Sequence, residues 1–258
     1  MDEASRFIRY VIPGLVSLLV IVLFLVILVP GVVFGMLSKL GEGGRPFAAI
    51  LMVFLGSGAL GYLHANVYFA GFCFFDCLVF DYRHIFRSQS PGLRAIDING
   101  KPVTLRSRRE AWSIAARFWA YRLRGKEGMG IEPLDKFVGT LVHHVHSLGA
   151  AAVGTLFSPF YCLLILWSLH SAPAKQTSMW LSDYSSSSDC SRWIAVFILW
   201  TILQAVFWLA RHSAKQAHEW ITSSQIIEKI SAGKQPVDVF FIKKGDGWQR
   251  VAGCSFRD

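Results

Sequence analysis

Charged side chains are scarce in this sequence. Asp, Glu, Lys and Arg make up 17% of the 258 residues, whereas 53% are hydrophobic and the mean hydropathy is +0.42. Soluble globular proteins carry about 25% charged residues. The shortage of charge excludes an ordinary soluble domain of this length and favours a membrane protein.

Catalytic signatures are missing as well. The chain contains no Gly-Lys-Ser/Thr phosphate loop, no Gly-x-Ser-x-Gly elbow and no His-Glu-x-x-His zinc motif. Its long apolar segments hold almost no ionisable residues, although pumps and coupled transporters usually need such groups near the middle of the membrane. We therefore expect a protein that is not an enzyme and that binds no cofactor.

Cysteine is rare, and its positions do not form a disulfide pattern. Most cysteines lie in apolar segments or on the side of the membrane that we assign below to the reducing cytoplasm, where disulfides do not persist. The five are Cys73, Cys77, Cys162, Cys190 and Cys254. No disulfide framework is therefore predicted.

Four apolar segments have the length of about 20 residues that a membrane helix needs. They are Ile12–Phe34, a stretch that begins at Phe47, Ser147–Leu169 and Trp193–Ala210. The apolar core of the first segment is far longer than the 7–15 residues or so of a cleavable signal peptide, so we expect it to be retained. The sequence predicts a mainly α membrane protein with four transmembrane helices.

Basic residues give these helices an orientation. Residues 35–46 and 170–192 contain four Lys and Arg together, whereas the remaining parts of the chain hold the other 22. Lys and Arg accumulate on the cytoplasmic side of membrane proteins. We therefore expect a bacterial inner-membrane protein with both termini in the cytoplasm.

The same pattern divides the chain into four parts. Residues 1–80 hold the first two transmembrane helices, 81–136 form a basic cytoplasmic segment, 137–210 hold the other two helices, and 211–258 form a helix extension and a C-terminal hairpin. Asn99-Gly100 and Lys-Gly-Asp-Gly each lie between strand-like runs, which predicts two β-hairpins. Together with a helix in 81–136 they would form a small cytoplasmic α+β domain.

That helix is predicted over Ser107–Gly125, with Ser107 and Glu110 as a capping box. It is basic and amphipathic, with both tryptophans on one face. Its candidate binding residues are Arg108, Arg109, Trp112, Arg117, Trp119, Arg122 and Arg124. Three interpretations remain open: the helix lies on the anionic inner leaflet, it packs its aromatic face and shows its arginines to a protein or nucleic acid, or it binds a small phosphorylated ligand. No motif supports nucleic acid specifically.

Polar and small residues mark the apolar segments. Polar side chains either join helices by hydrogen bonds, which is the default, or line a pore. They are His64, Asn66, Thr201 and Gln204. Small residues at four-residue spacing predict close helix packing, within one subunit or between the subunits of a homo-oligomer. They are Ser57, Gly61, Ala150, Gly154 and Ser158.

The stretch LVHHVHSLG raises the question of a metal. His143 and His146 share one helix face, and Asp76 on the antiparallel second helix lies at a similar predicted depth, flanked by Cys73 and Cys77. These are ligand types that zinc accepts. The favoured interpretation is nevertheless that the histidines lie in the headgroup zone, because the spacing does not match a standard zinc pattern.

The sequence thus predicts a non-enzymatic inner-membrane protein, an oligomeric anchor, sensor or effector. Its basic cytoplasmic domain would bind a partner and the anionic leaflet, and a prokaryotic stress or phage-defence system would fit this outline. One alternative is an ion channel lined by the polar residues of the second and fourth helices. The other is a membrane enzyme with a metal or haem.

Overall fold

The structure is a computed structural model that describes residues 7–40, 45–86, 93–97, 99, 101, 103–105, 107–119, 132–171, 190–232, 237–244 and 247–250. It is mostly helical. Four helical stretches are long and apolar enough to cross a membrane: Arg9–Leu28, Ile50–Phe74, Leu134–Leu169 and Cys190–Glu228. Each contains most of one predicted segment, so the four-helix prediction is confirmed.

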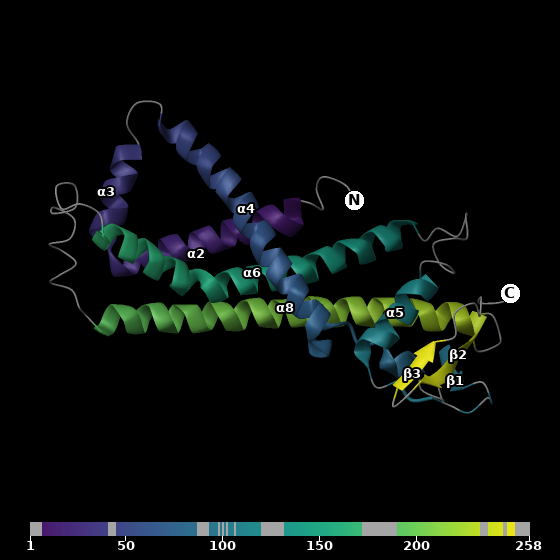
Figure 1. The fold of residues 1–258 in the computed structure, drawn as a ribbon. Coiled ribbons are helices and arrows are strands. Elements are labelled where there is room, and N and C mark those ends of the chain that lie inside the picture. Colours follow the sequence, from purple (N-terminus) through teal and green to yellow (C-terminus); the bar gives the residue numbers. More distant parts are fainter. Residues whose placement is uncertain are drawn as a thin grey trace. The chain divides into compact units, whose positions relative to one another are not determined.

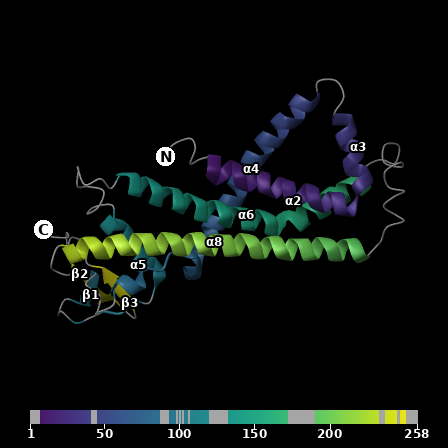
Figure 2. The same ribbon diagram turned by 180° about the vertical axis from the view of Figure 1, so that it is seen from behind.

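The chain divides into two compact units. Unit 1 comprises Met1–Ala70 and His143–Ser213, and unit 2 comprises Gly71–Val142 and Ala214–Asp258. Three helices contribute residues to both units, namely α4 (Arg45–Phe74), α6 (Glu132–Ser171) and α8 (Cys190–Ala232). Figures 1 and 2 show these helices from two sides. The two units are described separately below.

The first helical segment is shorter than predicted. A π-helical turn, η1 (Phe7–Val11), leads into α2 (Ile12–Leu28), and a separate helix, α3 (Pro30–Leu40), follows. Val29 between them has φ −139° and ψ 62°, outside the helical range. The predicted span Ile12–Phe34 was wrong in its end point, because Pro30 disfavours helical backbone in the preceding residue and suits the first position of a new helix.

In unit 1 the backbones of η1 and α2 touch that of α4. A Cβ atom added to Gly14 would lie 1.7 Å from the carbonyl oxygen of Ser57, and one added to Gly61 would lie 1.6 Å from that of Tyr10. Both distances are shorter than any van der Waals contact, so this crossing requires glycine on each helix. Such close approach is typical of membrane helices, whose association depends on packing because lipid is itself apolar.

Large apolar side chains complete the interior of unit 1. Phe24 and Leu28 of α2 are buried in one cluster with Cys162 of α6 and Val196 of α8. Most large apolar side chains elsewhere on α4 and α8 are exposed, including Phe54, Leu63, Phe197 and Leu209. This distribution suits helices that face lipid on their outer sides.

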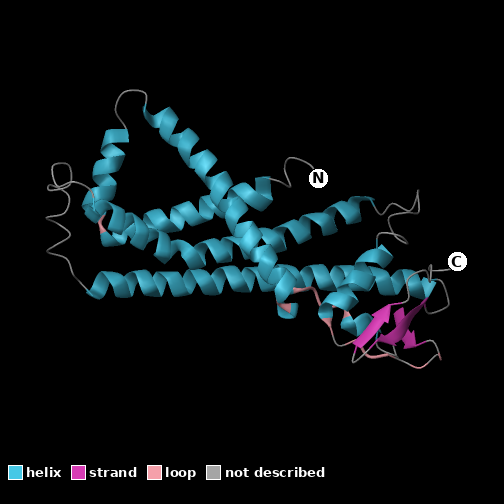
Figure 3. Ribbon diagram, viewed as in Figure 1, coloured by secondary structure: helices cyan, strands magenta, loops and turns pink. Residues whose placement is uncertain are grey.

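Unit 2 contains a three-stranded sheet, coloured magenta in Figure 3. Its strands are β1 (Leu93–Asp97), β2 (Val237–Lys244) and β3 (Gly247–Arg250), in the order β1-β2-β3. β2 pairs with β1 in parallel and with β3 in antiparallel orientation. The parallel pair, joining segments about 140 residues apart, was not predicted. The two predicted hairpins and the cytoplasmic location of this unit stay predictions.

Candidate functional site

His64, a buried histidine of the second span, lies in a network of hydrogen bonds across three helices of unit 1. Its Nδ1 is 3.1 Å from Oγ of Ser17 on α2, and its Nε2 is 3.1 Å from the hydroxyl of Tyr161 on α6. Ser17 and His64 are fully buried. Ionisable residues inside membrane spans are rare and often functional, so this hydrogen-bond network around His64 is one candidate site.

The direction of each hydrogen bond in this network follows from the number of hydrogens that each group can donate. Ser17 has one hydroxyl hydrogen, and it is donated to the carbonyl oxygen of Pro13 over 2.9 Å. Oγ of Ser17 must therefore accept from Nδ1–H of His64, and Nε2 then accepts from Tyr161. A serine nucleophile needs the opposite direction, because its histidine must accept the serine hydrogen. The arrangement joins helices and does not activate Ser17.

Gly154 of α6 makes room for the hydrogen-bond network around His64. A Cβ atom added to Gly154 of α6 would lie 1.9 Å from Oγ of Ser17 and 2.6 Å from Nδ1 of His64. Ala150 and Ser158, the neighbours of Gly154 in the predicted packing series, are buried as well. The small-residue series therefore lies where helices meet inside one subunit.

The other predicted pore residues have different surroundings. Gln204 of α8 donates to the carbonyl oxygen of Ala152 on α6 over 3.2 Å. Asn66 and Thr201 are exposed and donate to carbonyls of their own helices, those of Tyr62 and Phe197. His64 and Gln204 thus bond between helices, whereas Asn66 and Thr201 bond within their own helices.

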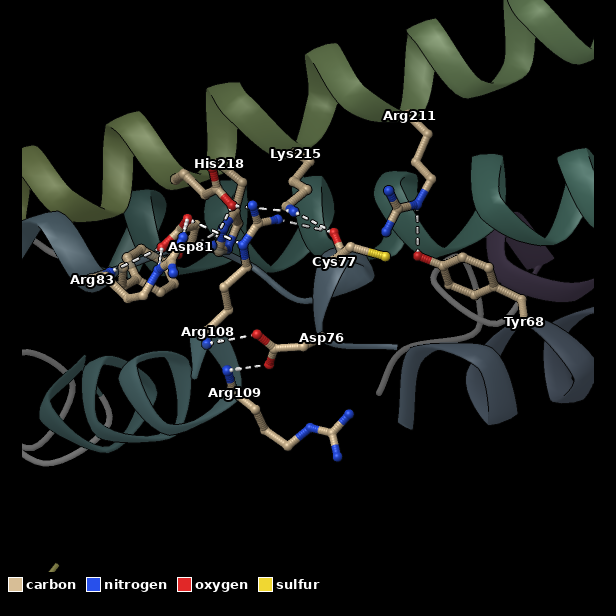
Figure 4. A network of polar contacts seen from close by, with 12 residues as sticks. Tyr68, Asp76, Cys77, Asp81, Arg83, Arg108, Arg109, Arg211, Lys215 and His218 are labelled. Carbon is tan, nitrogen blue, oxygen red and sulfur yellow. Dashed lines mark hydrogen bonds and ion pairs between the residues drawn. The ribbon is translucent and has the colours of Figure 1, made fainter. Parts of the chain in front are cut away.

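The basic helix of unit 2 is α5 (Arg108–Phe118). Ser107 caps it by accepting the N–H of Glu110 over 3.4 Å, as the capping-box spacing predicted. A second cap comes from Asp76, whose carboxylate accepts the N–H groups of Arg108 and Arg109. Partial burial raises the pKa of Asp76, but these bonds outweigh that effect, so its pKa lies below the ordinary value. Figure 4 shows this cap.

The apolar face of α5 is buried inside unit 2. Ala111, Ile114 and Ala115 are almost inaccessible to solvent. The ring of Trp112 packs edge-on against that of Phe72, with centroids 5.9 Å apart. Trp119 is buried and donates its indole N–H to Asp135 over 2.9 Å. Of the three interpretations of this helix, the packing favours the one in which the aromatic face contacts protein.

The first two arginines of α5 are fixed to the end of α4 and to the segment that follows it. Arg108 lies 3.2 Å from the Asp81 carboxylate and donates to the carbonyl oxygen of Cys77. Arg109 donates to the carbonyl oxygen of Phe72 over 3.2 Å and remains exposed. The side chain of Arg117, and all of Arg122 and Arg124, lie outside the described residues.

Asp81 is shared between two guanidinium groups. Arg83 contacts both of its carboxylate oxygens, at 2.9 and 2.7 Å, and Arg108 contacts one. The hydrogen bonds from Arg83 lower the pKa of Asp81 to about 2. The carboxylate is therefore charged at neutral pH and holds both arginines in place.

A polar face of α8 packs against the same segment, and sequence reasoning missed it. Lys215 donates to the carbonyl oxygen of Cys77, and Glu219 accepts the N–H of Asp81. His218 lies 2.9 Å from the hydroxyl of Tyr82, and Ser223 lies 2.9 Å from Nε2 of His84. Lys215, Glu219 and Ser223 recur every four residues and His218 lies three residues after Lys215, so the available signal was a polar stripe on a predicted helix. Figure 4 labels Lys215 and His218.

The predicted metal residues serve other contacts. The ring of His146 packs against those of Phe69 and Tyr68, with centroids 4.7 and 5.7 Å away. Cys73 and Cys77 are exposed, and Asp76 caps α5. Within the part of the chain that the structure describes, no group of three or more His, Cys, Asp and Glu could hold a metal ion. The pair His143 and His146 lies in unit 1 and the other three in unit 2, so the metal site stays a prediction.

Comparisons with known proteins give no relative. No protein-family model, no curated protein and no solved structure matches this chain.

Proposed function

We propose that this protein is a non-enzymatic membrane anchor, sensor or effector of the bacterial inner membrane. Both chain termini and the basic unit 2 lie in the cytoplasm, where unit 2 binds an acidic partner. The observation that carries the proposal is the buried apolar face of α5, at Ala111, Ile114 and Ala115. A helix whose apolar face is already used by its own protein has only its basic side left for a ligand.

The contacts at the start of α5 show which of its arginines are already engaged within the protein. Arg108 and Arg109 are held at the start of the helix by Asp81 and by carbonyl oxygens of Phe72 and Cys77. The partner surface in our proposal is therefore formed by Arg117, Arg122 and Arg124, which follow them in the helix predicted from the sequence over Ser107–Gly125. Guanidinium groups bind carboxylates and phosphates in the same bidentate manner, so an acidic protein surface or a nucleic acid would fit.

Continuous helices support a role in signalling rather than simple tethering. α4, α6 and α8 each supply residues to both units without a break at the unit boundaries, which follow Ala70, Val142 and Ser213. A helix transmits displacement along its axis far better than a flexible linker does. We propose that partner binding to unit 2 is transmitted along these helices to the spans.

Co-purification from the native membrane tests the proposed binding. The full chain is purified in a mild detergent, and bound protein and nucleic acid are identified by mass spectrometry and absorbance. We expect a stoichiometric partner that is lost when Arg117, Arg122 and Arg124 are all changed to Gln. The control changes Lys39, Arg45 and Lys175, the predicted outer-loop residues, to Gln, and it should retain the partner at the same reduced net charge.

Two outcomes would overturn the proposal. One is that nothing co-purifies while the protein binds vesicles of anionic lipid and the Arg117, Arg122 and Arg124 triple variant does not, since these arginines would then serve the membrane surface only. The other is that both triple variants lose the partner equally, which would indicate a dependence on net charge and not on this helix.

A further inference from the structure

An exposed run of five residues overlaps the end of the second span. This run, Cys73–Cys77, contains the last two residues of α4 and the start of the 3-10 turn η2 (Asp76–Leu78). Phe74 is 81% exposed and Phe75 61%. Phe74 is the most exposed of the large apolar side chains that the structure describes. Two adjacent aromatic side chains in water at the end of a membrane helix are unfavourable, and they indicate contact with another phase or molecule.

The charges beside this run favour an anionic contact. Asp76, the acid of the run, accepts the N–H groups of Arg108 and Arg109 and the hydroxyl of Ser107. Its charge is thus directed at the start of α5. The guanidinium of Arg109 contacts the carbonyl oxygen of Phe72, one of the last carbonyls of α4, and is exposed. A cation is therefore fixed at the same end of α4 as the two aromatic rings.

Aromatic rings beside an arginine match the chemistry of the membrane interface. Aromatic side chains are enriched at the level of the lipid headgroups, and arginines near the inner leaflet bind lipid phosphates. The second candidate span ends at Phe74, which places Phe74, Phe75 and Arg109 at that level. An acidic protein would satisfy Arg109 but would offer no apolar layer to the rings.

We propose that Phe74, Phe75 and Arg109 form a docking surface for an anionic phospholipid. The two rings insert at the boundary between headgroups and acyl chains, and the guanidinium binds the lipid phosphate. The surface is distinct from the partner surface proposed above, because it uses none of Arg117, Arg122 and Arg124. Either proposal can fail without the other.

Lipid selectivity of the full chain tests the phosphate contact. The protein is reconstituted in phosphatidylcholine nanodiscs, and fluorescent phosphatidylglycerol is titrated with energy transfer from tryptophan as the readout. We expect Arg109→Gln to lower the apparent affinity about fivefold, the effect of one basic residue near an anionic surface. Lys101→Gln, which removes another exposed basic residue of unit 2, should leave it unchanged. Equal affinity in wild type and Arg109→Gln, or an equal loss in both variants, would overturn the proposal.

The chain's own cysteines test the insertion of the rings. In a background with Cys190→Ser and Cys254→Ser, the exposed thiols of Cys73 and Cys77 react with a membrane-impermeant maleimide, whereas Cys162 is buried. We expect slow labelling in phosphatidylglycerol-containing discs and at least severalfold faster labelling after Phe74→Ser with Phe75→Ser. Phe137→Ser, at another exposed phenylalanine of unit 2, is the control. Rates that do not differ between the control and the double variant would show that the rings do not insert.

Discussion

The indole N–H of Trp200 on α8 donates to the carbonyl oxygen of Thr155 on α6 over 3.1 Å. Within α6 this carbonyl would normally accept the N–H of residue 159, but that residue is proline and has none. A buried carbonyl without a donor costs about 1–3 kcal/mol, so this one needs a donor from elsewhere. Trp200 supplies that donor and thereby fixes α8 against α6 at the proline.

Trp200→Phe should therefore destabilise the protein by about 1–2 kcal/mol, the cost of leaving a buried carbonyl without a donor. The cost should fall in a Pro159→Ala background, because the N–H of an alanine at position 159 can bond Thr155 within the helix. Unfolding in mixed micelles of increasing sodium dodecyl sulfate measures both values. Equal cost in the two backgrounds would show that the indole bond does not compensate for the proline.

The glycine crossing of α2 and α4 gives a second prediction. Gly61→Ala should prevent folding or cost several kcal/mol, because its Cβ would overlap the Tyr10 carbonyl oxygen at 1.6 Å. Gly58→Ala on the same helix has no atom within 4 Å of the added Cβ and should retain at least wild-type stability. Thermal unfolding of both variants in detergent makes the comparison. Similar melting temperatures would rule out this crossing.

These contacts show where the sequence was informative. Spacing alone marked Ser57 and Gly61 as a packing face, because small residues at four-residue intervals leave a groove on a helix. Gly14, which lies against Ser57 and Gly61, was missed. A spacing pattern on one helix does not say which other helix packs against it. The capping of α5 by Ser107 was predictable from adjacent residues, whereas the second cap from Asp76 comes from a residue 31 positions before Ser107.

The sheet and the break after α2 illustrate the same limit. Strand-like runs were visible within 95–105 and 238–253, but the parallel pairing of β1 with β2 depends on the path of the whole chain between them. The end of α2 depends on Pro30, a local signal that the continuous apolar run concealed. The number of spanning helices was predictable because it needs only length and hydropathy.

Variants of His64 and Gln204 distinguish a role in joining helices from a role in lining a pore. If these residues join helices, His64→Leu with Gln204→Leu should lower the free energy of unfolding by about 1–3 kcal/mol and leave any ion flux in liposomes unchanged. His64→Leu removes two inter-helix hydrogen bonds, to Ser17 and Tyr161, and Gln204→Leu removes one, to Ala152. A reduced flux at unchanged stability would instead place these residues in an ion path. Asn66→Leu, at an exposed site, controls for the loss of a polar group.

Acid should loosen the polar contacts of unit 2 through Asp81. The ordinary pKa of this carboxyl group is 3.8, and bonds from Arg83 lower it to about 2 in the folded chain. A carboxylate with a lowered pKa contributes stability that is complete above about pH 4 and is lost as the pH falls through about 2. The contribution is about 1–2 kcal/mol after allowance for partial exposure. Hydrogen exchange of residues 76–86 between pH 5 and pH 2, corrected for the intrinsic pH dependence of exchange, measures it.

We expect Asp81→Asn to raise exchange in this segment at pH 5 and to flatten its dependence on pH. Glu228→Gln removes a different, exposed acid of unit 2 and should leave the wild-type profile unchanged. Asp76 also has a lowered pKa and acts in the same direction, so the slope should become shallower without vanishing. If wild type and Asp81→Asn have the same slope, the two arginines are held in place by contacts other than the carboxylate that they share.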